Sequence, residues 1–414
     1  MEHNKLIFSK VPTLRFSEFA EQWEQKTFDE TFSILSNNTL SRAELNYENG
    51  NYKNIHYGDV LIKFSAFIDV SSPDVPYIND ENSSSKLDNI LLQDGDIIIA
   101  DTAEDFTVGK ATEVENIDES KVVSGLHTIP CRPKIKFSPR YLGYYVNSPA
   151  YHNQLIPFIQ GVKVCSISKA LIKKTFVSFP SLSEQTKIAN FLSYLDKKIE
   201  TQNKIISDLK VLKKELCRKL FNSSHCDKTI EIRQVADIYG GYAFNSKAYI
   251  SEGKYKIVTI GNVTGDKYIS GDYNRIDILP DNIQEQQILN NGDILISLTG
   301  NVGRISIVDG DNYLLNQRVA KLNVKNNLIK AYIYQYLSNS SFEKDMSNAG
   351  QGAAQKNIKN EDILSYNICI PTSQTYLEKI DGLLSTYDKL IANEERFLLN
   401  LNLQKSFLLN AMFI

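Results

Sequence analysis

Hydrophobic and polar residues follow two different patterns along the 414-residue chain, and each pattern occurs twice. Between residues 23 and 180, short β-branched or aromatic runs such as 97–99 are interrupted by Gly, Asn, Asp and Pro. That pattern predicts strands joined by turns. Between residues 183 and 221 neither Gly nor Pro occurs, and apolar residues recur at helical spacing. A second strand-rich stretch and a second helical stretch follow, so the pattern predicts two modules, each with a long helix after it.

The elements predicted within the two modules fall at similar places. Strands are expected at residues 97–99, 121–123, 175–179, 293–297, 304–308 and 365–370, and one helix per module at 140–151 and 331–342. Pro180 and Pro371 follow the last strand of each module and mark the point where it ends.

The first long helix is predicted from a seam of apolar residues. They stand three and four residues apart in alternation, except where Gln202 and Lys213 intervene: Ile188, Leu192, Leu195, Ile199, Ile206, Leu209, Leu216 and Leu220. Ser183 suits the N-cap and Glu184 suits the first turn. The final helix carries a similar stripe: Ile380, Leu383, Tyr387, Leu390, Phe397, Leu401 and Leu408. The simplest partner for each helix is the other one; the alternative is that each packs only on its own module.

Matched segments indicate an internal duplication. Residues 52–60 match 255–263 at an offset of 203, and residues 94–99 match 291–296 at an offset of 197. Gly161 with Ile167 matches Gly352 with Ile358 and Pro180 matches Pro371, both at an offset of 191, and residues 192–199 match 384–391 at an offset of 192. Five matches in the same order predict an α+β chain with an internal pseudo-two-fold repeat.

Charge and composition limit the classes of function. The net charge is -3, whereas freestanding DNA-binding proteins are usually basic, so a role with DNA must rest on local patches or on a basic partner. Residues 187–219 carry nine Lys or Arg against four Asp or Glu, which is also typical of a solvated helix face. No run of about 18 apolar residues occurs, and the first 16 residues lack a signal-peptide core, so no membrane span and a cytoplasmic location are expected. The five scattered cysteines suggest reduced thiols.

Sequence motifs of catalysis are missing. The chain has no G-x-x-x-x-G-K-[ST], G-x-G-x-x-G or H-E-x-x-H, and no Asn-Pro-Pro followed by an aromatic residue. Pro73-Asp74 and Glu119-Ser120-Lys121 stand too far apart, in polar loop sequence, to favour a nuclease site. Cys217, His225 and Cys226 match no usual zinc spacing. We therefore expect a binding protein without a metal or cofactor of its own.

Two similar modules on long helices suit an object with repeated geometry, and duplex DNA presents equivalent groove faces about every 34–36 Å. Candidate DNA-binding residues are the amide, hydroxyl and basic side chains of matching loops. In the first module they are Thr102, Thr107, Lys110, His127, Lys163, Ser166, Ser168 and Lys169. In the second they are Thr299, Asn301, Arg304, Asn316, Gln317, Arg318, Gln351, Gln355, Lys356 and Asn357. The neighbouring Asp101, Glu104 and Asp105 could accept from cytosine amino groups, but a turn-capping role is favoured for them. The glycines Gly300 and Gly303 are equally consistent with a plain hairpin turn.

These residues resemble a known family. The carriers are Pro12-Thr13-Leu14-Arg15-Phe16 with Trp23-Glu24, the paired Gly-Asp-Ile strands, Thr299-Gly300, Asn316-Gln317-Arg318-Val319, Gln355-Lys356-Asn357-Ile358, and Pro180 followed by Ser183-Glu184-Gln185. Together they resemble the specificity (S) subunit of Type I restriction–modification systems over essentially the whole chain. The second helix departs from the family pattern, because Thr372-Ser373-Gln374-Thr375-Tyr376 lacks the Glu-Gln pair.

The resemblance implies two target recognition domains spaced by helices that form an antiparallel coiled coil. It implies domains at residues 1–182 and 225–373, with spacer helices at 183–224 and 374–414. It also implies double-stranded DNA, two methyltransferase (M) subunits and restriction (R) subunits as partners, with S-adenosylmethionine held by the M subunits. Two other classes remain open: a single-chain nuclease with duplicated recognition domains, and a coiled-coil protein adaptor without DNA specificity.

Overall fold

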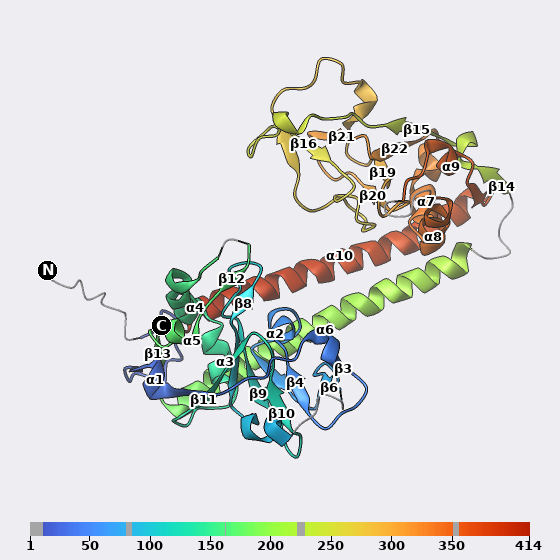
Figure 1. Ribbon diagram of the computed structural model, residues 1–414. Helices are drawn as coiled ribbons and strands as arrows, with labels where there is room; N and C mark the ends of the chain where they lie inside the picture. The colour runs from blue at the N-terminus through green and yellow to red at the C-terminus, as the bar shows by residue number, and fades with distance from the viewer. Residues whose placement is uncertain (1–10, 80–84, 162, 222–227, 351–355) are drawn as a thin grey trace. The chain divides into compact units, whose positions relative to one another are not determined.

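The computed structural model describes residues 11–79, 85–161, 163–221, 228–350 and 356–414 (Figure 1). Its contacts divide the chain into two compact units, residues 1–202 with 397–414 and residues 203–396. Each unit therefore contains one strand-rich module and a part of each of two long helices, α6 (Leu182–Phe221) and α10 (Gln374–Ala411).

The module of the first unit is built on a five-stranded sheet, β2-β11-β7-β9-β5, and a four-stranded sheet, β10-β4-β6-β3, with two further pairs, β1-β13 and β12-β8. The strands are β1 (Glu24–Thr27), β2 (Phe32–Ile34), β3 (Leu45–Asn46), β4 (Lys53–Ile55), β5 (Phe67–Asp69), β6 (Tyr77–Ile78), β7 (Ile97–Ala100), β8 (Thr102–Ala103), β9 (Ala111–Glu115), β10 (Val122–Ser124), β11 (Thr128–Pro133), β12 (Cys165–Ser166) and β13 (Phe176–Phe179). The short helices are α1 (Phe28–Thr31), α2 (Tyr57–Ile62), α3 (Tyr141–Val146), α4 (Pro149–Leu155) and α5 (Lys169–Ile172). Ile97 and Ile99 face one core and Ile98 faces another, as the two-residue period of a strand requires.

The module of the second unit repeats this plan with four-stranded sheets β15-β22-β19-β20 and β17-β16-β21-β18 and the pair β14-β23. Its strands are β14 (Lys228–Glu231), β15 (Ala236–Gly240), β16 (Tyr255–Val258), β17 (Asn274–Ile276), β18 (Ile288–Leu289), β19 (Ile294–Ser297), β20 (Ile305–Ile307), β21 (Tyr313–Leu315), β22 (Val319–Val324) and β23 (Asn367–Ile370). Its short helices are α7 (Asn327–Leu337), α8 (Ser340–Ala349) and α9 (Asn360–Leu364).

Strand registers support the duplication that the sequence offsets predicted. Antiparallel and parallel strand pairs occur in both modules between residues that match at the offsets 203, 197 and 191. The matching register pairs are Thr128 with Ala100 and Val319 with Ser297, then Ser124 with Ile55 and Leu315 with Val258. The two modules therefore share the central part of one topology, to which the first module adds the edge strands β5 and β3.

The offset between matched residues of the two modules changes in smaller steps than the sequence suggested. The backbone N–H of Ala100 donates to Lys110, and that of Ser297 donates to Arg304. Lys110 and Arg304 are thus equivalent at an offset of 194, between the offsets 197 and 191. The offset therefore falls from 197 to 191 in two steps of three residues, one on each side of β9 and its counterpart β20.

Each helix predicted inside a module is in fact two helices. The range 140–151 covers α3 and the start of α4, and 331–342 covers most of α7 and the start of α8. Pro149 is the first residue of α4, a position where its missing N–H costs nothing. In the second module the Asn339 side chain accepts from the N–H groups of Ser341 and Phe342 and starts α8 as an N-cap. The spacing of apolar residues alone did not reveal these breaks.

The seam predicted for α6 is confirmed, but its predicted cap is not. Ile188, Leu192 and Leu195 are buried, and Gln202 is buried in line with them. Helix α6 begins at Leu182, and Ser183 lies exposed inside its first turn rather than before it. Ser181 precedes the helix, and its carbonyl accepts from the N–H of Gln185. Ser181 therefore holds the N-cap position.

The stripe predicted for α10 was partly wrong. Leu383, Leu390 and Phe397 are exposed, each by more than 40%. Each of them has an apolar neighbour one residue further along, and Leu384 is fully buried. Where two apolar residues adjoin, a sequence period does not decide which one faces the partner helix.

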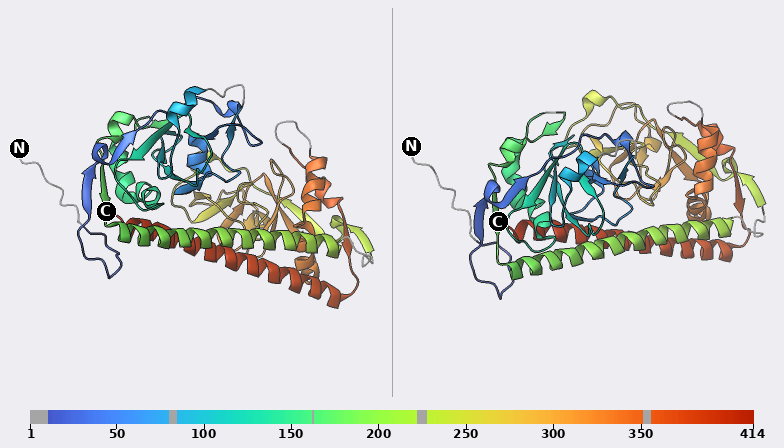
Figure 2. Two further views of the ribbon diagram at one scale, coloured as in Figure 1. Left: turned by 90° about the horizontal axis from the view of Figure 1, so that it is seen from below. Right: turned by 60° about the horizontal axis from the view of Figure 1, so that its bottom comes forward.

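Within each unit, α6 and α10 pack on each other in antiparallel directions. In the first unit Ile188 and Leu192 of α6 share a core with Leu401 and Leu408 of α10. Both views of Figure 2 show the red C-terminal end of α10 beside the first part of α6. In the second unit Lys210 pairs with Glu395 and Lys213 with Asp388, so α10 numbers fall as α6 numbers rise. The expected helix pairing is therefore confirmed.

The prediction that all cysteines are reduced was wrong. Cys369 is disulfide-bonded, whereas Cys131, Cys165 and Cys217 are free and buried. Scattered spacing without a C-x-x-C pair did not indicate this bond. Among the described residues, no helix combines the length and the apolar character needed to span a membrane.

Candidate nucleic-acid interface

Four of the eight candidates in the first module, Thr102, His127, Ser166 and Lys169, lie together with Asn37 in one polar cluster, which we call the first polar rim. Ser166 of β12 lies opposite Thr102 of β8. The Thr102 hydroxyl donates to Asp101 at 2.8 Å and lies 3.3 Å from Nδ1 of His127. Nζ of Lys169 lies 3.4 Å from Oδ1 of Asn37. These side chains come from four separate stretches of sequence, and strand pairing brings them together.

His127 is held at this rim by its backbone. Its φ of 55° lies in the left-handed region, which few residues other than glycine adopt. Its carbonyl accepts from the N–H of Asp101, and its ring meets the edge of Tyr57 at 5.2 Å. The side chain remains 46% exposed, with Nδ1 3.4 Å from a carboxylate oxygen of Asp101. The imidazole is therefore fixed in place and accessible to a ligand.

The other candidates of the first module lie away from this cluster or serve local structure. Asp105 accepts from the N–H and hydroxyl of Thr107, which confirms the turn-capping role expected for that acidic residue. Nζ of Lys110 donates to the Leu61 carbonyl at 2.8 Å, and burial lowers its pKa, with the nearby Lys405 adding to the shift. Ser168 caps α5 by accepting from the N–H of Leu171, and Lys163 is exposed.

In the second module the second polar rim consists of Thr299, Asn316, Gln317, Arg318 and Asn357. Thr299 forms a β-bridge with Asn357. The carbonyl of Arg318 accepts from the N–H of Leu298 at 3.0 Å, which attaches the segment 316–318 to the same edge. Gln317 and Arg318 are exposed, and the Arg318 guanidinium makes no hydrogen bond or ion pair within the described part of the chain. The Arg318 guanidinium is therefore available to bind a ligand at this rim.

The remaining candidates of the second module flank the rim. Nε of Arg304 donates to Glu343 at 3.1 Å, and Nζ of Lys356 donates to Ser347 at 2.7 Å. Asn301 is exposed, and its carbonyl accepts from the hydroxyl of Ser297. Gly303 has a φ of 80°, so the turn that precedes Arg304 requires a left-handed residue. Gln351 and Gln355 lie outside the described residues.

The two polar rims occupy equivalent positions in the two modules. Ser166 pairs with Thr102 as Asn357 pairs with Thr299, at the offsets 191 and 197. The N–H groups of Asp101 and Leu298 donate to the carbonyls of His127 and Arg318, which match at 191. The same backbone frame therefore presents a hydroxyl and an imidazole in one module, and an amide and a guanidinium in the other.

Sequence reasoning missed Asn37 in the first module and Tyr242 in the second. Asn37 donates through Nδ2 to the Gly125 carbonyl at 3.2 Å, two residues before His127. The N–H of Tyr242 donates to the Leu315 carbonyl, and its own carbonyl accepts from the N–H of Gln317. Each residue follows the first strand of the large sheet in its module, β2 or β15. This equivalent position in the two copies of the repeat is the sequence feature from which both residues could have been predicted.

The chemistry of the rims is that of recognition. Hydroxyl, amide, imidazole and guanidinium groups together supply donors and acceptors that match base edges and phosphates. Beneath the first rim, burial lowers the pKa of His56, with Arg42 adding to the shift, so its neutral Nδ1 accepts from the N–H of Gly58. Over the residues that the structure describes, no three His, Cys, Asp or Glu side chains converge as metal ligands.

A family model decides the assignment of the chain. The model described as "Type I restriction modification DNA specificity domain" matches residues 20–211 and, a second time, residues 228–402. The chain belongs to this family. The two matches cover both modules and most of both long helices, in agreement with the duplication.

Curated relatives carry names from the same systems. The Type I restriction enzyme MjaVIII specificity subunit of Methanocaldococcus jannaschii is 26% identical over 239 residues, which cover 51% of this chain and 55% of the relative. This chain therefore spans only about half the length of that relative. A second relative from the same organism has the provisional name type I restriction enzyme MjaX specificity subunit. It is 24% identical over 371 residues, which cover 86% of this chain and 84% of the relative.

Two solved structures share the fold. The S subunit of a Type I restriction–modification system from M. genitalium superposes with a TM-score of 0.54 at 16% identity, covering 98% of this chain and 99% of that one. A chain from a structure of the type I R-M system, solved for its complex assembly and conformational transition, gives 0.57 at 15% identity, covering 94% and 96%. The fold expected for the Type I specificity family, two strand-rich modules with two long paired helices, is therefore confirmed.

Proposed function

We propose that this chain is the DNA sequence-recognition subunit of a Type I restriction–modification complex, in which each module reads one half of a bipartite site. The observation that carries the proposal is the pair of equivalent polar rims. His127 and Arg318 occupy matching backbone positions, as do Ser166 and Asn357, yet their side chains differ. Reading two half-sites of different sequence requires this combination, because the frame places a side chain and the side chain selects the base.

Each rim carries groups suited to the major groove. A guanidinium such as that of Arg318 pairs with the O6 and N7 atoms of guanine, and an amide such as that of Gln317 pairs with the edge of adenine. The hydroxyls of the rims and the exposed ammonium groups of Lys163 and Lys169 suit phosphates, which position a protein without specifying sequence. Asn301 and Lys356 flank the second rim and belong to the same proposed contact.

The spacer helices are the proposed docking surface for two methyltransferase subunits. Large apolar residues are exposed at positions that match at an offset of 192, in both α6 and α10. These pairs are Phe191 and Leu383, Ile205 and Phe397, and Val211 and Leu403. Repeated apolar exposure suits two copies of one partner. The proposed domains are residues 1–182 and 225–373 for recognition, with residues 183–224 and 374–414 setting the unread spacer.

Catalysis belongs to the partners in this proposal. The methyltransferase subunits supply S-adenosylmethionine and flip the adenine, and restriction subunits join the complex afterwards. A net charge of -3 fits a recognition subunit whose partners supply much of the positive charge around DNA. The complex acts on double-stranded DNA in the cytoplasm.

A module exchange tests the proposal. Residues 1–182 are replaced by the corresponding module of another family member, the chain is produced together with its methyltransferase, and methylated adenines are mapped along the host genome by single-molecule sequencing. One half of the methylated sequence should change while the other half and the spacer persist. The matched exchange of residues 225–373 should change only the other half.

Three outcomes contradict the proposal. If both halves or neither half change, the modules are not independent readers. A purified chain that cuts DNA with only a divalent metal is a nuclease instead. A chain that gives no sequence-selective DNA binding even with methyltransferase present is a protein adaptor.

A further inference from the structure

One carboxylate in the first unit joins three separate elements. Asp196 on α6 accepts from the Tyr144 hydroxyl of α3 at 2.8 Å and from Nζ of Lys405 of α10 at 2.6 Å. The side chains of Asp196 and Lys405 are 17% and 25% exposed. We call Tyr144, Asp196 and Lys405 the first junction, because the module and both long helices meet there.

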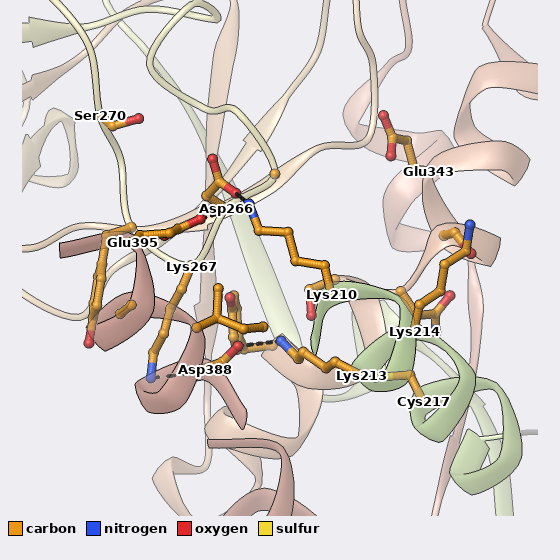
Figure 3. A pocket seen from close by; sticks show the side chains of 18 of the residues that line it. Lys210, Lys213, Lys214, Cys217, Asp266, Lys267, Ser270, Glu343, Asp388 and Glu395 are labelled. Carbon is orange, nitrogen blue, oxygen red and sulfur yellow. Dashed lines mark hydrogen bonds and ion pairs between the residues drawn. The ribbon is translucent and has the colours of Figure 1, made fainter. Parts of the chain in front are cut away.

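The second unit contains the counterpart. Asp388 on α10 accepts from Nε2 of Gln335 of α7 at 2.9 Å and is paired with the ammonium of Lys213 of α6. Figure 3 shows Lys213 directed at Asp388, with Lys267 on the other side of the carboxylate at 3.9 Å. Asp388 keeps only 5% of its side chain exposed. Gln335, Asp388 and Lys213 form the second junction.

The two junctions are reciprocal. Asp196 and Asp388 match at an offset of 192, Lys213 and Lys405 match at 192, and Tyr144 and Gln335 match at 191. In the first junction α6 supplies the carboxylate and α10 the ammonium, and in the second the roles are exchanged. Each copy of the duplicated sequence therefore contributes an acid to one junction and a base to the other.

Each junction lies beside a cavity between its module and the long helices, which is lined from both α6 and α10 in the second unit and from α10 in the first. The cavity in the second unit measures about 470 Å³ and is lined by Lys213, Asp388 and Ser338 among others (Figure 3). The cavity in the first unit measures about 410 Å³ and is lined by Lys405, Tyr144 and Asn147, the last of which matches Ser338. Apolar clusters also join each module to the long helices, and the junction adds a directional polar contact at the edge of each cavity.

The ammonium groups of Lys213 and Lys405 stand at positions where a charge is energetically unfavourable, which indicates that they serve to fix the geometry of the junctions. Lys213 and Lys405 take positions that the alternating spacing of the seam assigns to apolar residues. A buried ion pair adds little net stability compared with apolar packing, because both charges lose their water. Polar residues at seam positions are best known for fixing the register of paired helices.

We infer that the residues of the two junctions are positioning residues that hold each module in one orientation on the helix pair. Because each module has one orientation, the complex accepts only one spacer length between the two half-sites. This inference rests on the proposed function. The junction residues do not read bases, so they act on the tolerated spacer and leave the sequence of either half-site unchanged.

The test uses the full chain with its methyltransferase and a library of sites whose spacers differ by one or two base pairs. Asp388→Asn and Lys213→Met each break the second junction. Both should raise methylation of sites with a spacer one base pair too long or too short by at least tenfold, with both half-site sequences retained. Glu215→Gln is the matched control on α6, since it breaks an exposed pair with Arg218 and should leave the spacer unchanged.

A charge reversal separates positioning from loss of folding. Asp388→Lys combined with Lys213→Asp, both made in a Lys267→Gln background because the Lys267 ammonium lies 3.9 Å from the Asp388 carboxylate, restores the pair with opposite polarity. Gln335 suits either arrangement, because its amide nitrogen now donates to Asp388 while its buried Oε1 has no partner. The double variant should recover the single spacer.

Three outcomes decide the matter. A double variant as tolerant as the single variants overturns the inference, and so does a single spacer in both single variants. A change in either half-site sequence assigns the residues to reading and also overturns it. If the unaltered chain directs no methylation to a bipartite site, the proposed function itself fails, which is a separate result.

Discussion

Arg15 and Glu184 form a two-pronged ion pair, with Nε to Oε1 and Nη2 to Oε2 both at 2.7 Å. Glu184 is almost fully buried in the first turn of α6, and Arg15 belongs to the segment that precedes the first module. One residue earlier, the N–H of Leu14 donates to the Ala411 carbonyl at the end of α10. The segment before the first strand therefore ties the beginning of α6 to the end of α10.

We expect Arg15→Met to lower the free energy of unfolding of the first unit by about 1–2 kcal/mol, because Glu184 is left buried without its ionic partner. The measurement is urea unfolding followed by the fluorescence of Trp23. Trp23 is the chain's only tryptophan, and it is buried beside Phe413 in the same unit. Arg15→Lys should recover only part of the loss, because an ammonium does not reproduce the two-pronged geometry.

Lys173→Met is the control for this experiment. Its pair with Asp29 is about half exposed on both sides, and exposed pairs contribute little to stability. An equal loss in Lys173→Met and Arg15→Met would show that the burial of Glu184 has no special weight.

Glu113 is a carboxyl inside the first module whose environment favours the neutral form. Burial raises its pKa to about 7, even though the N–H groups of Gly143 and Arg140 donate to it. The unfolded chain releases this proton near pH 4.5, whereas the folded chain retains it up to about pH 7. The folded state therefore binds more protons in this window, and stability falls as the pH rises through it and levels off above about pH 7.

Glu113→Gln should remove this dependence. Between pH 5 and pH 8 the unfolding free energy of the first unit, again read from Trp23, should fall by about 2–3 kcal/mol less in the variant than in the unaltered chain. Glu24→Gln, which changes an exposed carboxyl of β1, should retain the full dependence. A variant Glu113→Gln with an unaltered slope would place the titrating group elsewhere.

The duplication and the strand-rich modules were predictable because they rest on repeated local patterns. The strand at residues 97–99 and its partner at 293–297 are short buried runs bounded by turns, and both were found. The face of α10 was not predictable, since Leu383 and Leu384 are both apolar and only packing against Cys217 of α6 and Tyr332 of α7 selects Leu384. Local pattern therefore decides the elements, and tertiary contact decides which side of them is buried.

The rims show the same division at the level of single residues. Thr102 and Ser166 were proposed from separate loops, and only the pairing of β8 with β12 brings them together. Lys110 carries the same charge as the exposed Lys163, yet its ammonium is turned inward onto the Leu61 carbonyl. Sequence supplies the type of a polar group, while the path of the backbone decides whether DNA can reach it.

Arg318→Ala tests the second rim as a base reader. Because the guanidinium is exposed and has no intramolecular partner among the described residues, its loss should affect one half-site only, by about 1–3 kcal/mol in binding free energy. The measurement compares the affinity of the complete complex for its own site with that for sites altered at single positions of each half. Arg233→Ala is the control, because Arg233 is exposed in the same module but is paired with Glu231 and Glu361. An equal loss on all sequences would make Arg318 a phosphate contact.

The proposal that α6 and α10 set the spacer length is tested by lengthening both helices by one seven-residue repeat of the apolar seam. Seven residues are inserted after Asn203 in α6 and seven after Glu395 in α10, two positions that match at an offset of 192 and lie away from both junctions. Seven residues preserve the alternation of three and four, so the seam continues across the insertion. At 1.5 Å per residue the helices gain about 10 Å, which corresponds to about three base pairs at 3.4 Å each. Mapping of methylated adenines should therefore show the same two half-sites with a spacer about three base pairs longer. The same insertion in only one helix mismatches the seam and should abolish methylation rather than lengthen the spacer, and an unchanged spacer after both insertions would rule out that proposal.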